Sequence, residues 1–272
     1  MTEETILAKL PRKHRNLVLG IGDDCAIYRP RPGEDLVFTT DLFMEGVHFE
    51  QAARPIPRRA LARSLSDIAA MGATPRFCLV SLALPGWADE QWVDEFFAGL
   101  LELANETNTA LAGGDLSHAN QLVCDVMVCG SVPRDQALRR DGARPGDAIY
   151  VSGALGGWRH RRDIAPRLKE GRKLRGKATA CIDISDGLAL DLHRLCQASK
   201  VSAALDYIPL LEGATQEQAL HDGEDYELLY TAPPRTRVPG IRIGTITSGT
   251  GLLTYAGQPI TPKGYDHFGN RS

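Results

Sequence analysis

One pattern recurs along the chain and limits the folds open to it: an apolar, strand-forming segment leads into a turn with glycine nearby and an acidic residue at the strand's end. Between such segments, residues 57–71 and 90–107 have apolar side chains at helical spacing and predict helices. Strands that alternate with helices predict an α/β (α+β) fold. The acidic residues of the pattern are Asp23 and Asp24, Asp41, Asp115, Asp183 and Asp186, and Glu224 and Asp225.

The length of 272 residues allows one large domain or two domains of modest size. We place a boundary near residue 135, which divides the chain into an N-terminal domain, 1–135, and a C-terminal α/β domain, 136–272. The acidic pattern occurs in both, so we expect the second domain to complete a site begun in the first. Residues 153–177 are rich in Gly and Arg and predict a linker with one short helix.

The composition excludes several classes of protein. Hydrophobic residues make up 43% and charged residues 24%, as in ordinary globular proteins, and a net charge of -3 offers no basic surface for nucleic acid. No apolar run is long enough for a membrane span, and the first residues lack a secretory signal, so we expect a cytoplasmic protein without a membrane partner. The six cysteines are scattered without a C-x-x-C pair, which predicts buried, reduced thiols and no zinc site.

Acidic side chains gathered from several strand ends would repel one another unless cations neutralised them. Oxygen ligands without His or Cys favour Mg²⁺ over Zn²⁺, and Mg²⁺ held by carboxylates most often serves a polyphosphate substrate. An alternative remains open at each position, because aspartates at strand ends also form turns and cap helices. Asp186, directly before a predicted helix at 188–198, is the clearest candidate for such a cap.

Seven motifs, in this order along the chain, resemble those of the thiamine-monophosphate kinase family. They are GIGDDCA at 20–26, TTD at 39–41 with GVHF at 46–49, LSDIAAMGA at 65–73, GGD at 113–115, IDISDGL at 182–188, GEDYEL at 223–228 and KGYDHF at 263–268. The family belongs to the aminoimidazole ribonucleotide synthetase-like superfamily. The resemblance therefore implies an ATP-using enzyme with a two-domain fold, a mixed N-terminal sheet with helices, and a homodimer formed through the N-terminal domain.

The resemblance also implies roles for the residues at matching positions. The implied Mg²⁺ ligands are Asp24, Thr39, Thr40, Asp41, Asp67, Asp115, Asp183 and Asp186, of which Asp41, Asp67 and Asp183 are the catalytic candidates. The implied ATP contacts are Gly114, Asp115, Arg140 and Ser185, and the implied substrate contacts are His48, Glu224 and Tyr265. Without the resemblance, His48 reads as a packed histidine and Arg140 as a surface arginine, and these alternatives stay open. An aromatic face at Tyr265 suits a cationic thiazolium ring.

The reaction implied by the resemblance is transfer of the γ-phosphoryl group of ATP to thiamine monophosphate, which gives thiamine diphosphate. The acceptor phosphate is already ionised at neutral pH, so we expect direct in-line transfer with several Mg²⁺ ions and no general base. The sequence departs from the family in two places. Residues 153–177 are short where relatives have an extra helix, and Asp222 stands where the family has glycine.

Two other functions remain open. One is another ATP-using enzyme of the same superfamily, although a selenophosphate synthetase would need a reactive cysteine near the N-terminus and none precedes Cys25. The other is a non-catalytic sensor of nucleotide or thiamine phosphate. The complete set of carboxylates argues against the sensor.

Overall fold

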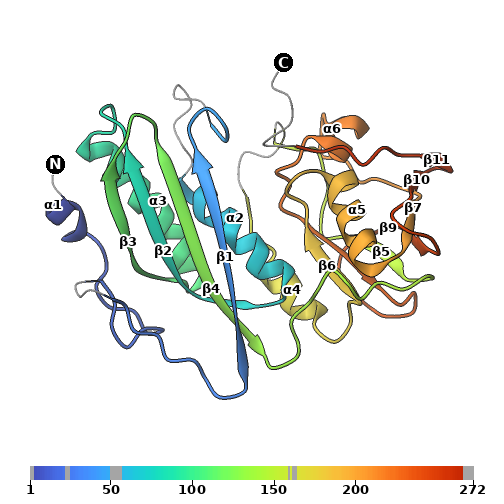
Figure 1. Cartoon of the computed structure of the whole chain (residues 1–272), viewed down its shortest axis with the longest axis horizontal. Helices are drawn as coiled ribbons and strands as arrows, with labels where there is room; N and C mark the ends of the chain where they lie inside the picture. The colour runs from blue at the N-terminus through green and yellow to red at the C-terminus, as the bar shows by residue number, and fades with distance from the viewer. Residues whose placement is uncertain (1–2, 22–24, 50–56, 159, 161–163, 266–272) are drawn as a thin grey trace. The chain divides into compact units, whose positions relative to one another are not determined.

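The computed structural model describes residues 3–21, 25–49, 57–158, 160 and 164–265 (Figure 1). Helices and strands are mixed in these residues, which confirms the predicted α/β fold class. The chain forms two compact units: an N-terminal unit, Met1–Ile68 with Thr74–Arg134, and a C-terminal unit, Ala69–Ala73 with Asp135–Ser272. No helix of the described residues combines the length and the apolar character that a membrane span requires.

The N-terminal unit is built on a four-stranded mixed sheet with the order β1-β4-β2-β3. β1 (Glu34–Met44) and β2 (Thr74–Leu84) each pair antiparallel with β4 (Val123–Pro133). β2 also pairs parallel with β3 (Ala110–His118). A parallel pair needs a crossover connection, and α3 (Glu90–Thr107) supplies it.

Two helices lie on one face of this sheet (Figure 1). α2 (Pro57–Ala70) is fixed to the sheet by Ser64, whose Oγ donates to the carbonyl oxygen of Val126 at 2.8 Å. The fully buried side chains of Leu61 and Leu65 form the apolar face of α2. The opposite face of the sheet carries more exposed residues, including Phe38 and Leu42 of β1, which are 63% and 50% exposed.

The bounds of α3 follow from local chemistry. The side chain of Asp89 accepts the N–H of Trp92 at 2.8 Å, which caps the first turn. Val93, Phe96 and Leu100 recur at helical spacing and are buried. The helix ends at Asn108, which adopts a left-handed conformation with φ of 55°. A short helix, α1 (Glu3–Leu7), precedes the sheet and was not predicted.

The C-terminal unit contains a seven-stranded sheet with the order β11-β10-β7-β9-β5-β8-β6, in which only β7 and β10 pair parallel within the described residues. Its strands are β5 (Ala148–Val151), β6 (Ala180–Asp183), β7 (Ser202–Leu205), β8 (Leu228–Ala232), β9 (Ile241–Thr247), β10 (Leu253–Tyr255) and β11 (Gln258–Pro259). Its helices are α4 (Leu168–Leu174), α5 (Leu188–Ser199) and α6 (Gln216–His221). α4 is the one short helix predicted for residues 153–177.

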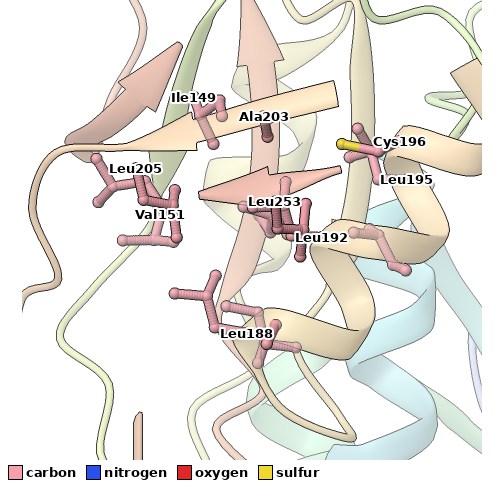
Figure 2. Close-up of a cluster of buried hydrophobic side chains, with 14 of the residues drawn as sticks. Ile149, Val151, Leu188, Leu192, Leu195, Cys196, Ala203, Leu205 and Leu253 are labelled. Atoms are coloured by element: carbon pink, nitrogen blue, oxygen red, sulfur yellow. The ribbon is translucent and has the colours of Figure 1, made fainter. Parts of the chain in front are cut away.

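The core of the C-terminal unit forms where α5 packs on the sheet. Figure 2 shows Leu188, Leu192 and Leu195 of α5 directed toward apolar side chains of the strands. Val151 and Leu205 of the sheet are at most 1% exposed in this cluster. The packing fixes the start of α5, so it also fixes the loop that joins β6 to α5.

Three local predictions were wrong. β1 does not end at Asp41 but continues to Met44. Residues 113–115 are not a loop, because they lie inside β3. Cys25 is exposed, whereas the other five cysteines are buried as predicted.

Candidate active site

In the N-terminal unit, three of the candidate Mg²⁺ ligands lie on the face of the sheet that carries α2. Thr39 and Asp41 are two residues apart on β1, so their side chains share a face with the buried Phe43. Thr39 Oγ1 donates a short hydrogen bond to Asp67 Oδ2 of α2. Strand and helix thus bring together a hydroxyl and two carboxylates that are distant in sequence.

Asp41 has an unusual environment. Its Oδ2 atom is buried and accepts no hydrogen bond within the described residues. The Nη2 atom of Arg63, on α2, lies 4.0 Å from the other carboxylate oxygen, Oδ1. A buried acceptor without a donor costs free energy, and a bound cation would remove that cost. The donor set here, all oxygen, fits Mg²⁺.

Thr40 points to the opposite face of β1. Its Oγ1 donates to Asp125 Oδ1 of β4 at 2.5 Å. Asp125 pairs with Ser81 of β2, which pairs in turn with Asp115 of β3, so the three side chains form one row on that face. β1 therefore separates the candidate ligands of this unit into two groups, one on each face of the sheet.

No three side chains of the His, Cys, Asp or Glu type meet closely enough to hold a metal by themselves in the described part of the chain. Asp24, the remaining candidate ligand of this unit, lies outside the described residues, as does Asp23. Mg²⁺ commonly takes only one or two protein carboxylates and completes its shell with water and substrate phosphate. Pairs of protein oxygens are therefore sufficient for this cation.

A cavity of about 1020 Å³ opens beside Asp115 and Gly114. Apolar side chains of β2, β3 and the N-terminal segment, such as Leu79, Leu111 and Tyr28, form most of its wall. A largely apolar cavity with a few polar groups is typical of a small-molecule site. Gly114 is needed for strand packing too, because a Cβ at this position would lie 1.8 Å from the carbonyl oxygen of Val80.

His48 follows β1 in a tight turn. Its Nδ1 atom accepts the backbone N–H of Met44 at 3.0 Å, and its ring stacks on Phe43 with a centroid distance of 5.8 Å. This geometry matches the packed histidine that was the open alternative. It also leaves Nδ1 occupied as an acceptor, so the second ring nitrogen, Nε2, is the one that carries hydrogen in the neutral imidazole.

In the C-terminal unit, the loop between β6 and α5 carries three candidates. Asp183 ends β6 and is 3% exposed, while Ser185 and Asp186 follow in the loop. Asp191, in the first turn of α5, accepts the N–H groups of Ser185 at 3.0 Å and of Asp186 at 2.9 Å. Burial raises the pKa of Asp191 to about 6, although the backbone donors and Arg194 oppose this shift.

Asp186 does not cap α5. The residue at the N-cap position is Gly187, and no side chain caps the helix there. The Asp186 carboxylate instead accepts from Arg194 Nη1 at 2.5 Å, and the same nitrogen donates to Asp191 at 2.7 Å. The capping alternative considered for Asp186 is therefore wrong. Its carboxylate binds Arg194, and the N–H groups of the loop are bound by Asp191.

Two further candidates lie against this loop. The N–H of Glu224 donates to the carbonyl oxygen of Ser185 at 2.7 Å, and the N–H of Tyr265 donates to that of Asp186 at 3.0 Å. Four of the candidate site residues, from three separate segments, are thereby brought together: Ser185, Asp186, Glu224 and Tyr265. Tyr265 is 41% exposed and so accessible to a ligand.

Arg140 is exposed, as a surface arginine would be. Its segment runs beside β6, because the N–H of Cys181 donates to the carbonyl oxygen of Arg139 at 2.8 Å. The carbonyl oxygen of Arg140 accepts from Ser199 Oγ at 2.7 Å. Both hydrogen bonds hold the backbone, and neither of them involves the guanidinium group.

The sequence interpretation did not identify Asp125 or Asp191. Asp125 had a detectable signal, because it interrupts an apolar strand, Val123 to Val128, in which an aspartate is unexpected. Asp191 had only the weaker signal of an acidic residue in the first turn of a helix. Its contact with the loop requires the folded structure.

Comparison with known proteins identifies the family of this chain. Residues 22–132 match the N-terminal domain of AIR synthase related proteins. Thiamine-monophosphate kinase of Rhodopirellula baltica is 37% identical over 309 residues, with 97% of each chain covered. The enzyme of the same name from Escherichia coli K12 is 36% identical over 300 residues, with 92% of each chain covered.

Solved structures give the same result. The thiamine-monophosphate kinase of Stenotrophomonas maltophilia K279a has a TM-score of 0.83 at 35% identity, covering 94% of this chain and 96% of that one. AaThiL, complexed with AMPPCP and TMP, has a TM-score of 0.79 at 30% identity, covering 91% and 92%. The hydrogenase maturation protein HypE has a TM-score of 0.80 at 19% identity, a likeness of fold alone.

The fold and the match of residues 22–132 together define a two-unit α/β protein of the AIR synthase-related class. Within that class, HypE shares the fold at low identity, whereas the thiamine-monophosphate kinases share sequence over nearly the full length. The chain belongs to the thiamine-monophosphate kinase family. It is therefore an enzyme, and its class is kinase.

Proposed function

We propose that this chain transfers the γ-phosphoryl group of ATP to the phosphate of thiamine monophosphate. An oxygen of the acceptor phosphate forms a bond to the γ-phosphorus, and the bond from that phosphorus to the β–γ bridging oxygen breaks. ADP and thiamine diphosphate are the products. The acceptor is already an anion at neutral pH, so the step needs no general base and passes through no phosphorylated side chain.

The observation that carries this proposal is the backbone hydrogen bonding around Ser185 and Asp186. It joins Glu224 and Tyr265, candidates for binding thiamine phosphate, to a loop whose residues are candidates for ATP and metal. Glu224 complements the positive charge of the thiamine ring system, and the Tyr265 ring provides a face for it. The bound state of AaThiL, with AMPPCP and TMP, supports the same pair of substrates.

Mg²⁺ is the cation that fits the candidate residues, since they offer oxygen ligands and one buried carboxylate oxygen, on Asp41, that accepts no hydrogen bond within the described residues. When bound, Mg²⁺ would neutralise phosphate charge and hold donor and acceptor in line. The residues that would bind it are Asp24, Thr39, Thr40, Asp41, Asp67, Asp115, Asp183 and Asp186.

Other residues of the chain would bind the two substrates directly. Gly114, Arg140 and Ser185 would contact ATP, with Arg140 offering a planar fork for phosphate oxygens. His48, Glu224 and Tyr265 would contact thiamine phosphate. For His48 we infer that the Nε2 edge of the ring does so, because Nδ1 is already bonded to Met44.

A homodimer is part of the proposal. The face of the N-terminal sheet opposite α2 exposes the apolar side chains of Phe38 and Leu42 beside the polar row of Asp125, Ser81 and Asp115, and a second copy would cover the two apolar side chains. The same face of the second copy would pack against this face across a two-fold axis, which is the commonest symmetry of soluble dimers.

The deciding experiment incubates the protein with ATP, Mg²⁺ and thiamine monophosphate and follows ADP and thiamine diphosphate by chromatography. Equal amounts of both products are expected, with none when EDTA replaces Mg²⁺. Binding of both substrates without product would identify a sensor instead. ATP consumption without thiamine diphosphate would indicate another enzyme of the superfamily.

A further inference from the structure

An ion pair between a partly exposed arginine and a buried glutamate in the C-terminal unit lies three residues along the chain from the candidate substrate residue Glu224 but plays no part in the roles above. Arg167 donates to Glu227 through two nitrogens, Nε to Oε2 at 2.7 Å and Nη2 to Oε1 at 2.5 Å. The Glu227 side chain is 1% exposed and that of Arg167 is 29% exposed. Two parallel bonds of this kind fix both distance and orientation.

Glu227 has further anchors. Ser152 Oγ donates to Glu227 Oε2 and also accepts the N–H of Leu228 at 2.8 Å. Gly153 leaves room for the carboxylate, because a Cβ at that position would lie 2.7 Å from Glu227 Oε1. The side chain of Glu227 is therefore held from two segments, one at Ser152 and Gly153 and the other at Arg167.

The segment that connects Glu227 to Glu224 is short and strained. Residues 223–227 have no regular secondary structure, and two of them, Glu224 and Tyr226, have left-handed φ values of 57° and 50°. Such conformations are disfavoured in a non-glycine residue and persist only where the surroundings impose them. Asp225, fully buried between the two, is itself held by the N–H groups of Gly156 at 3.0 Å and Gly157 at 3.1 Å.

The same segment is bonded to the loop between β6 and α5. The N–H of Tyr226 donates to Ile184 O at 2.8 Å, and the N–H of Ile184 donates to Glu227 O at 2.8 Å. The anchor at Glu227 and the exchange with Ile184 together determine where Glu224 stands against Ser185. A shift of Glu227 would therefore move Glu224 relative to that loop.

We propose that Arg167, acting through Glu227, is a positioning residue that sets the place of Glu224 and thereby the affinity of the enzyme for thiamine phosphate. The inference rests on the proposed function, in which Glu224 contacts that substrate. A buried ion pair is a weak source of net stability, since an apolar pair of the same size is often as stable. The two hydrogen bonds from Arg167 instead fix the orientation of the Glu227 carboxylate, which an apolar pair would not do.

The test compares Arg167→Ala, Arg167→Lys, Glu227→Gln and the double variant Arg167→Ala/Glu227→Gln with wild type. Each is measured for kcat, for KM toward thiamine monophosphate and toward ATP, for thermal stability, and for amide hydrogen exchange in a peptide covering residues 223–228 without substrate. Arg139→Ala is the matched control, because Arg139 makes a similar two-pronged contact with Asp141 on the surface.

In Arg167→Ala we expect the KM for thiamine monophosphate to rise about tenfold, with a smaller change in the KM for ATP, and exchange in 223–228 to accelerate. Arg167→Lys should recover part of the loss. The double variant should regain stability, because it leaves no unpaired buried charge, yet keep the raised KM. Arg139→Ala should match wild type.

Two results would overturn the inference. One is an unchanged KM and unchanged exchange in Arg167→Ala. The other is a double variant in which KM returns to the wild-type value together with stability, since the pair would then serve stability alone. A wild-type enzyme that makes no thiamine diphosphate would instead refute the proposed function. The hydrogen-exchange measurement would then still test whether the ion pair of Arg167 and Glu227 orders residues 223–228.

Discussion

The N–H of Tyr265 donates to the carbonyl oxygen of Asp186 at 3.0 Å, so the end of the described chain is bonded to the loop that begins α5. Gly264 makes this approach feasible, because a Cβ there would lie 2.4 Å from the same carbonyl oxygen. His221 Nδ1 donates to the carbonyl oxygen of Lys263 at 2.9 Å and fixes the preceding turn. Two hydrogen bonds, at Lys263 and at Tyr265, therefore hold the backbone that carries the Tyr265 ring.

If Asp41 binds Mg²⁺ as proposed, Asp41→Asn should lower kcat by more than about a hundredfold, because a neutral amide cannot replace a carboxylate ligand of a cation. The fold should survive, since the substitution preserves shape and removes a buried charge. Steady-state kinetics and thermal unfolding check the two statements. Asp94→Asn, at a surface ion pair with Lys9, is the control and should leave both unchanged. Near-normal turnover in Asp41→Asn would refute the role of Asp41.

Gly114→Ala should destabilise the enzyme by about 2–3 kcal/mol, because the new methyl group would overlap the carbonyl of Val80 and force β2 and β3 apart. Gly86→Ala is the matched control, since no atom lies within 4 Å of a Cβ placed there, and its effect should stay within about 0.5 kcal/mol. Urea denaturation measures both. Equal stability of the two variants would contradict the close strand approach.

The cysteines should differ sharply in reactivity. Burial raises the pKa of Cys78 and of Cys196 to about 12 and that of Cys129 to about 11, whereas Cys25 is exposed. Because the thiolate is the reactive form, iodoacetamide should modify Cys25 first in the native enzyme. Mass spectrometry after brief labelling tests this, with the urea-unfolded protein as a control in which all six thiols react. Rapid native labelling of Cys78 would contradict its burial.

Phe38→Glu should shift the enzyme from dimer to monomer if the exposed face of the N-terminal sheet joins two copies, because a charge would be buried in the contact. Sedimentation equilibrium measures the mass directly. Tyr207→Glu is the control: Tyr207 is 54% exposed on the C-terminal unit, so its variant should keep the mass of wild type. A monomeric wild type, or a dimeric Phe38→Glu variant, would exclude this face as the interface.

Local chemistry made some elements predictable. α3 spans the predicted residues 90–107, because Asp89 and Asn108 mark its two ends and the apolar spacing between them is regular. The end of β1 was predicted at Asp41, yet pairing with β4 extends the strand to Met44. Residues 113–115 looked like a glycine loop, but the close approach of β2 requires glycine within the strand. Both errors arise where partners distant in sequence outweigh local preference.

In the candidate site, too, sequence motifs were predictable and contacts between distant residues were not. The resemblance made Glu224 and Tyr265 candidates for substrate contact, and the structure bonds the backbone of both to the loop at Ser185 and Asp186. It could not reveal that Arg194 binds Asp186, that Asp191 binds the loop amides, or that Arg167 binds Glu227. These contacts join residues on different elements, and no spacing in the sequence predicts them.

The alternation along β1 has a consequence for how the enzyme could evolve. Thr39 and Asp41 face α2 while Thr40 faces Asp125, so neighbouring positions of one strand serve opposite sides of the sheet. Inserting or deleting a single residue between Glu34 and Thr39 would invert the strand, sending Asp41 to the Asp125 side and Thr40 toward α2. Insertions and deletions should therefore be confined to the turns that flank β1, even where substitutions of its individual side chains are tolerated.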